Sequence, residues 1–421
     1  MSTSAALLHP GGLWRSLTAQ LYAARALRAL GDGFISILLP VYLTRLGLGP
    51  VEVGAVATAT LLGSGIATLV VGHLGTRRDQ RGLLLLSSFL MMGTGLAYAV
   101  AGDLALLLIV GFVGTLNPSS GDVSIFVPLE HAMLARSAPD EVRTRVFARY
   151  SLIGALAAAV GSLLAPAPLL LTKLGVSELA ALRGMFVAYA ALGLASALIY
   201  RQLPASKAVS PAPGSSALGP SRHTVYKLAA LFSLDAFAGG FIVQSLLALW
   251  LFERFGLSLT TAGVFFFWSG VLSAFSFPVA AWIGSRIGLI NTMVFTHIPS
   301  SICLILAAFA PNVGVALTLL LLRAALSQMD VPTRTSYVMA VVTPAERPAA
   351  ASITAVPRSL AASIGPAFAG ALLTTSFLGW PLVICGALKI TYDLLLLRTF
   401  WHIKPPEEGP AAGSLKPQPR V

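Results

Sequence analysis

Residues 45–54 read RLGLGPVEVG, and residues 254–263, in the other half of the chain, read RFGLSLTTAG. A shift of 209 residues places Arg45, Gly47, Leu48 and Gly54 on identical residues without a gap. Internal similarity at one long offset predicts a chain that is built from two copies of one structural unit.

Further matches follow in the same order along the chain. The 209-residue shift also places GHLGTR at 72–77 on AWIGSR at 281–286. A shift of 208 places Asp122 on Asp330, and a shift of 204 places Arg143 on Arg347 and Gly161 on Gly365. Four ordered matches at nearly one offset indicate a duplication over most of the chain.

The composition predicts a membrane protein. Of 421 residues, 56% are hydrophobic and only 10% are charged, with a mean hydropathy of +0.83. A soluble domain has roughly 25% charged residues. In lipid every backbone polar group must be satisfied internally, which favours a helix bundle. We expect an all-α fold of twelve transmembrane helices in two six-helix bundles, with apolar runs near 22–45, 50–73, 82–100, 104–128, 147–170, 181–200, 225–251, 259–283, 291–310, 314–341, 350–376 and 380–400.

Basic residues in the loops predict the orientation. They gather in alternate loops, which marks those loops as cytoplasmic under the positive-inside rule. The net charge of +12 is therefore a topology signal and does not indicate nucleic-acid binding. We expect a multi-pass protein of the cell inner membrane with both termini in the cytoplasm. The basic set is Arg77, Arg78, Arg81, Arg136, Arg143, Arg145, Arg201, Lys207, Arg222, Arg286, Arg347, Arg398 and Lys404, against Arg45, Lys173 and Arg254, with Arg183 at a helix edge, in the other loops.

The middle of the chain has the composition of a linker. Residues 202–223 are rich in Pro, Ser, Ala and Gly and cannot bury apolar area. The predicted organisation is an N-terminal bundle at 1–201, a cytoplasmic linker at 202–224, a C-terminal bundle at 225–403 and a disordered cytoplasmic tail at 404–421.

Cofactor chemistry is not expected. Cys303 and Cys385 both lie in apolar runs, which argues against a disulfide framework or a zinc site. The chain has no HExxH, GxSxG or phosphate-binding loop, so we expect neither an enzyme, nor a metal, nor a cofactor.

The loop at 72–82, GHLGTRRDQRG, resembles the signature loop of the major facilitator superfamily, Gly-x-Leu-Ala-Asp-Arg-x-Gly-Arg-Arg. The helix count, central linker and half-repeat agree with efflux-type, twelve-helix bacterial members. The resemblance implies a monomeric secondary transporter, with a gating loop formed by Gly72, Thr76, Arg77, Arg81, Ser285 and Arg286. Thr76 and Ser285 stand where the family has its acidic residue. The alternative is that the basic cluster of this loop only enforces topology.

Acidic residues inside the apolar runs need a reason, because a charge at the bilayer centre is costly. Asp32, Asp122, Asp235 and Asp330 fall on the first, fourth, seventh and tenth predicted helices. These helices are repeat mates, and the resemblance implies that they line a central cavity. We expect Glu130 to lie in a solvated loop, and Asp393 to neutralise Lys389 one turn away.

Helical spacing places several of these charges on shared faces. Arg25, Arg28 and Asp32 lie at i, i+3 and i+7, and Arg323, Ser327, Asp330 and Arg334 share a face of the tenth helix. Such polar stripes must face protein or water. Either proton and substrate handling or purely structural ion pairs would explain them. The candidates for proton coupling or substrate binding are Asp32, Arg28, Asp122, Asp235, Arg323, Asp330 and Arg334.

Two matching segments are predicted to break their helices. Pro and Gly interrupt the fourth helix within Asn117–Asp122, and Pro332 follows Ser327–Val331 in the tenth. Paired broken helices are the best sequence indication of a transporter's binding site. The substrate-cavity candidates are Asn117, Ser119, Ser120, Ser327 and Gln328. For His297 beside Pro299, a proton relay and a packing role both remain open.

The sequence thus predicts a transporter that moves a small molecule by alternating access, with protons as the driving ion. The resemblance to efflux-type members implies export as the direction. The alternative is a proton-coupled importer of a small organic anion, which Arg25, Arg28, Arg323 and Arg334 would attract.

Overall fold

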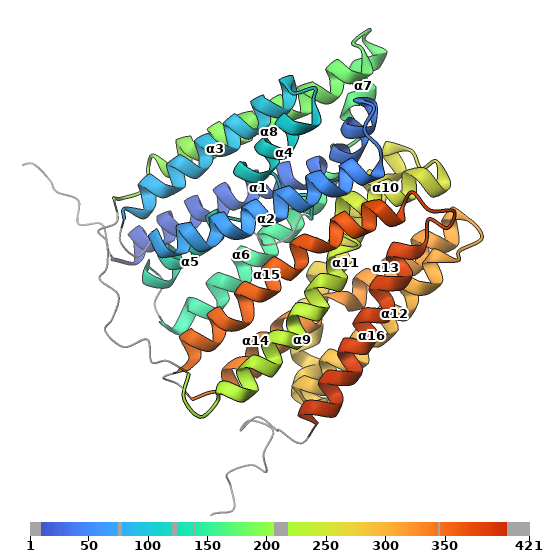
Figure 1. Ribbon diagram of the computed structural model, residues 1–421. Helices are drawn as coiled ribbons and strands as arrows, with labels where there is room; N and C mark the ends of the chain where they lie inside the picture. Colours follow the sequence, from blue (N-terminus) through green and yellow to red (C-terminus); the bar gives the residue numbers. More distant parts are fainter. Residues whose placement is uncertain are drawn as a thin grey trace, which may run out of the picture.

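The computed structural model describes residues 10–74, 78–119, 124–137, 140–205, 218–343 and 346–401, and within them it is helical without strands. The first half of the chain forms eight helices (Figure 1). Their bounds are α1 Pro10–Arg45, α2 Pro50–Leu74, α3 Gln80–Val100, α4 Leu104–Val113, α5 Phe126–Ser137, α6 Asp140–Ser162, α7 Ala167–Lys173 and α8 Glu178–Tyr200.

The second half repeats this pattern. Its helices are α9 Arg222–Gly240, α10 Gln244–Phe255, α11 Leu259–Ile287, α12 Leu289–Ala308, α13 Val313–Ser327, α14 Asp330–Ala340, α15 Arg347–Leu372 and α16 Trp380–Phe400. Four pairs of successive helices, α4–α5, α6–α7, α9–α10 and α13–α14, are broken spans, so sixteen helices make twelve spans. Nine described helical segments are long and apolar enough to cross a membrane by themselves. The twelve-helix prediction is confirmed.

The break between α9 and α10, at residues 241–243, was not predicted. Most of the predicted linker, residues 206–217, and the tail at 404–421 lie outside the described residues. The last residues of α8 and α16 and the first of α9 mark one end of the bundle, which we call the linker side, and the other end is the opposite side.

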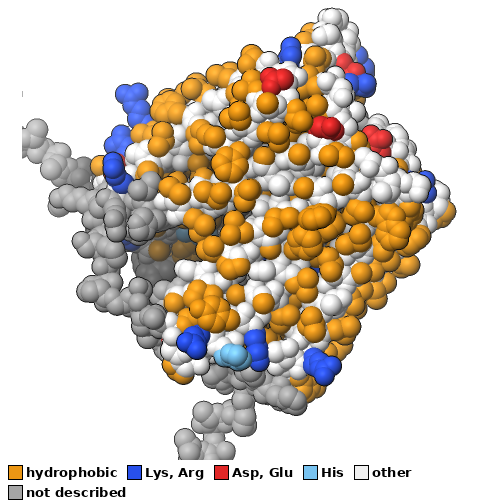
Figure 2. Space-filling model, viewed as in Figure 1, with side chains coloured by type: hydrophobic (Ala, Val, Ile, Leu, Met, Phe, Trp, Pro, Cys, Tyr) orange, Lys and Arg blue, Asp and Glu red, His pale blue; other side chains and the backbone are white. Residues whose placement is uncertain are grey.

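The outer surface suits lipid. Figure 2 shows hydrophobic side chains across the middle of one face, with charged side chains toward its edges. Large apolar side chains such as Phe89, Ile109, Trp268, Phe295 and Phe368 are exposed. Exposed apolar area of this extent is expected of a protein solvated by acyl chains.

Glycines allow the helices of each half to pack closely. A Cβ on Gly161 in α6 would lie 2.1 Å from the carbonyl oxygen of Leu30 in α1. In the second half, a Cβ on Gly365 would lie 2.6 Å from the Cα of Gly240. Gly161 and Gly365 are repeat mates, so the duplication preserves these contacts. Small residues at such positions let the backbones of neighbouring helices approach closely.

Candidate functional site

A cavity of about 440 Å³ lies between the two halves. It is lined by many small and hydroxyl side chains, together with a group of charged or titratable ones. That group consists of Arg25, Asp32, Asp235, His297, Arg323, Arg358 and Lys389. The volume falls within the range of small-molecule sites, roughly 300–1,000 Å³.

On the opposite side of the cavity, the two glycines of the opening repeat lie at close contacts between the halves. A Cβ on Gly54 in α2 would lie 2.5 Å from the carbonyl oxygen of Pro366 in α15. A Cβ on Gly263 in α11 would lie 2.7 Å from the carbonyl oxygen of Ser162 in α6. Each glycine therefore brings a helix of one half against a helix of the other, and Ser162 also lines the cavity. Figure 1 shows α15 beside α2 between the halves.

The two predicted breaks contribute polar groups to the cavity. Between α4 and α5, the Asn117 side-chain oxygen accepts hydrogen bonds from the backbone N–H (3.0 Å) and hydroxyl (2.8 Å) of Ser119. This turn presents Ser119 to the cavity, and Ser327 and Gln328 line it from the break between α13 and α14. The predictions for Ser120 and Asp122 lie outside the described residues.

Arg28 and Glu130 form a buried ion pair in the first half. Arg28 Nη2 lies 2.5 Å from Glu130 Oε2, and the side chains are 3% and 0% exposed. Tyr200 donates to Glu130 Oε1 at 2.7 Å, and the Tyr150 hydroxyl donates to Oε2. The Phe126 ring lies 4.1 Å from Arg28 Cζ. The prediction that Glu130 is solvated was wrong, because α5 turns this carboxylate inward onto Arg28 and two tyrosines.

Asp32 lies one turn further along α1 and lines the cavity. It is buried, with 9% of its surface exposed. Its carboxyl group makes no hydrogen bond or ion pair with any residue of the described ranges. The predicted shared face of α1 is thus divided: Arg25 and Asp32 border the cavity, and Arg28 is engaged by Glu130.

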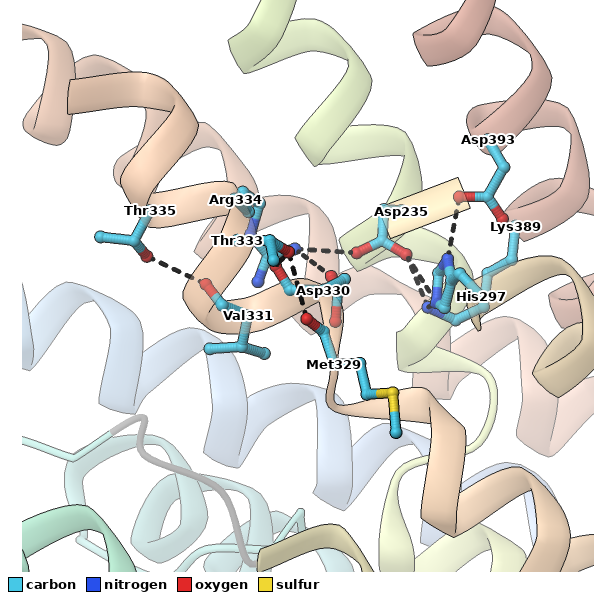
Figure 3. Close-up of polar contacts among 10 residues, drawn as sticks. All are labelled: Asp235, His297, Met329, Asp330, Val331, Thr333, Arg334, Thr335, Lys389 and Asp393. Carbon is cyan, nitrogen blue, oxygen red and sulfur yellow. Dashed lines mark hydrogen bonds and ion pairs between the residues drawn. The ribbon is translucent and has the colours of Figure 1, made fainter. Parts of the chain in front are cut away.

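A chain of charged groups crosses the second half (Figure 3). Arg334 Nη1 lies 2.9 Å from Asp330 Oδ2 and 3.3 Å from Asp235 Oδ2. Lys389 Nζ donates to Asp235 Oδ1 at 2.6 Å and lies 3.3 Å from His297 Nε2. Asp235 on α9 therefore joins α14 to α16.

His297 continues this chain, since its Nδ1 lies 3.1 Å from Asp393 Oδ1. The predicted pairing of Lys389 with Asp393 was wrong. The two residues are one turn apart on α16, but Lys389 reaches Asp235 on α9, whereas Asp393 faces His297 on α12. His297 lies between Lys389 and Asp393, and the choice between a proton relay and a packing role stays open.

Two arginines on the cavity wall have no such partner. Arg323 lies just before the last turn of α13, and Arg358 lies in the middle of α15. Within the part of the chain that the structure describes, neither guanidinium forms a hydrogen bond or an ion pair, and Arg358 Nε is buried without a partner. Sequence reasoning missed Arg358, although an arginine inside the apolar run 350–376 is a signal that could have found it.

The signature-loop residues that are described make contacts within their own halves. Arg81 Nη2 donates to the carbonyl oxygen of Arg201 at 2.7 Å, at the end of α8. Ser285 Oγ donates to the Trp282 carbonyl at 2.8 Å, and Arg286 lies over the Trp282 ring. Gly72 lies in α2, and Thr76 and Arg77 lie outside the described residues. The gating role of this loop stays a prediction.

Comparison with known proteins decides the family. The family model of the Major Facilitator Superfamily matches residues 21–322 and 228–421. The chain belongs to the Major Facilitator Superfamily. It is 24% identical over 416 residues to an uncharacterized membrane protein of Saccharomyces cerevisiae, YJR124C, covering 90% of this chain and 93% of the yeast protein.

Solved structures of superfamily members share the fold. A bacterial homologue of the human lysosomal transporter Spinster, inward-facing and unoccupied, aligns with a TM-score of 0.73 at 15% identity, covering 92% of this chain and 98% of that one. The xylose transporter XylE from E. coli, inward open, aligns with a TM-score of 0.69 at 15% identity, covering 93% and 96%. As a member of the superfamily, the chain is a multi-pass transporter of small molecules and not an enzyme.

Proposed function

We propose that this superfamily member couples the movement of a small molecule to the movement of protons by alternating access, with export as the direction. The observation that carries the coupling is the state of Asp32. Each of the other described acids buried in the spans, Glu130, Asp235, Asp330 and Asp393, contacts a basic side chain. Asp32 lines the cavity without such a contact.

A carboxyl group outside an ion pair can bind and release a proton without breaking one. Its charge is costly in the membrane, so its protonation state alters the energy of any conformation that seals the cavity. The contact chain around Asp235 supports the conformational part of the cycle, because Arg334 and Lys389 tie α9 to both α14 and α16. These three helices then move together.

The closed contacts at Gly54 and Gly263 support a cavity that faces the linker side. Among described residues, no hydrogen bond or ion pair joins the halves at the linker side. We further propose that the linker side is cytoplasmic, in the inner membrane, and that the chain acts as a monomer. The resemblance to efflux-type members favours export over import.

The test uses everted membrane vesicles that contain the full-length chain and a panel of labelled small molecules. In such vesicles, a proton gradient that is acidic inside the lumen should drive accumulation of at least one compound, because protons leave the lumen in exchange for the compound that enters it. Absence of gradient-driven flux across the panel contradicts the proposal. Accumulation only in right-side-out vesicles contradicts export and indicates import. Protease digestion of the C-terminal tail from the two sides checks the orientation.

A further inference from the structure

Arg323 and Arg358 lie within the spans with no carboxylate in contact, and both are half-buried and line the cavity. Most other charges in the spans are matched. Arg28 and Arg334 have carboxylates within 3.3 Å, and Lys389 has Asp235 at 2.6 Å.

Two guanidinium groups without a carboxylate partner line the same cavity and give it a positive site. Their desolvation is costly unless an anion offsets it. The planar fork of arginine matches the oxygens of a carboxylate, sulfonate or phosphate, and its charge persists at any physiological pH. Asp235 does not fulfil this role, since both of its oxygens are already engaged by Lys389 and Arg334.

The other residues that line the cavity indicate the chemistry of the rest of the ligand. Small and hydroxyl side chains, among them Ser300, Ser327 and Ser359, lie beside the arginines, and Phe266 and Phe277 add apolar surface. At about 440 Å³ the cavity suits a small molecule with an anionic head and an apolar body.

We propose that Arg323 and Arg358 bind the anionic group of the substrate, so that the transported compounds are small organic anions. The inference rests on the proposed transport function and names its substrate class. This assignment is narrower than the alternative from the sequence, in which several arginines of the spans attract an organic anion. Arg28 and Arg334 are excluded because Glu130, Asp235 and Asp330 already neutralise them.

The experiment measures equilibrium binding to the purified full-length protein in nanodiscs, without any gradient. Benzenesulfonate and benzoate are the anionic probes, benzenesulfonamide and benzamide are their neutral counterparts, and benzylammonium is the cation. The anions should bind, and the neutral and cationic probes should bind at least about tenfold more weakly. Equal binding by the neutral probes, or no anion binding up to about 10 mM, overturns the inference.

Variants then locate the site. Arg323→Gln and Arg358→Gln should each weaken anion binding by about tenfold or more, whereas Arg398→Gln, at an exposed arginine in the last turn of α16, should leave it unchanged. Arg323→Lys and Arg358→Lys keep the charge without the fork, and they should retain part of the affinity. Unchanged affinity in both glutamine variants overturns the assignment. If the glutamine variants do not fold, the lysine variants and the probe selectivity of the unmodified protein decide it.

Binding and flux separate the two claims. Anion binding without gradient-driven flux leaves the substrate site standing and contradicts the proton coupling. Gradient-driven flux of neutral or cationic compounds, without anion binding, leaves the proton coupling standing and contradicts the anionic substrate site.

Discussion

The buried pair of Arg28 and Glu130 offers a quantitative test of how charges are held in this bundle. Glu130→Gln removes the negative charge and leaves Arg28 buried without a counter-ion. Both side chains are almost fully inaccessible, at 3% and 0% exposed, so water cannot replace the lost partner. Breaking a buried pair in this way costs about 3–5 kcal/mol in free energy of unfolding.

The matched control is Glu178→Gln, the same chemical change at the exposed pair of Arg45 and Glu178. Their side chains are 56% and 44% exposed and 2.9 Å apart. Removal of such a pair should cost about 0–1 kcal/mol. Reversible unfolding in mixed SDS micelles, followed by tryptophan fluorescence, gives both values.

A double variant refines the test. Arg28→Met with Glu130→Leu removes both charges, and apolar replacement of a whole buried pair is often neutral. We therefore expect the double variant to be more stable than Glu130→Gln alone. Equal losses of under about 1 kcal/mol for Glu130→Gln and Glu178→Gln, or a double variant less stable than the single one, would refute the reasoning.

Three further outcomes are expected. Gly161→Val should lower the thermal midpoint strongly, since a Cβ there would lie 2.1 Å from a carbonyl oxygen, and Gly93→Val, with no atom within 4 Å, should change it little. Gly54→Leu should prevent closure of the opposite side, so that spin labels on the two halves at that end are further apart than in the unmodified protein. Hydrogen bonds from Thr343 and Ser221 lower the pKa of Glu346, in the loop before α15, from about 4.5 to about 2. Its contribution to stability is therefore complete above the ordinary pKa and is lost as the pH falls toward 2, and Glu346→Gln should flatten that part of the profile of thermal midpoint against pH.

The fold was accessible from the sequence because its signals are local or periodic. Hydropathy gave the spans, and the repeat that contains Gly54 and Gly263 gave the two halves. The structure adds that both glycines lie at contacts between the halves. The breaks at Asn117 and Ser327 were also predictable, because Pro and Gly interrupt helical hydrogen bonding locally.

Pairing of the buried charges was not accessible from the sequence. Which carboxylate meets which base depends on how helices far apart in the chain rotate toward one another. Spacing along α16 suggested Asp393 for Lys389, but α9 brings Asp235 closer. For the same reason Glu130, which looked like a loop residue, proved to be a buried ion-pair partner. Tertiary packing decides these contacts, and the helical periodicity of the sequence carries no information about that packing.

Proton coupling through Asp32 is the central claim, and Asp32→Asn in proteoliposomes tests it most directly. The measurement compares two modes for a transported compound: exchange at equal concentrations, which needs no driving ion, and accumulation against a gradient, which does. Asp103→Asn is the matched control, since Asp103 is exposed and caps α4 away from the cavity. The account predicts that Asp32→Asn retains exchange and loses proton-driven accumulation, while Asp103→Asn retains both. Proton-driven accumulation at the unmodified level in Asp32→Asn would contradict it.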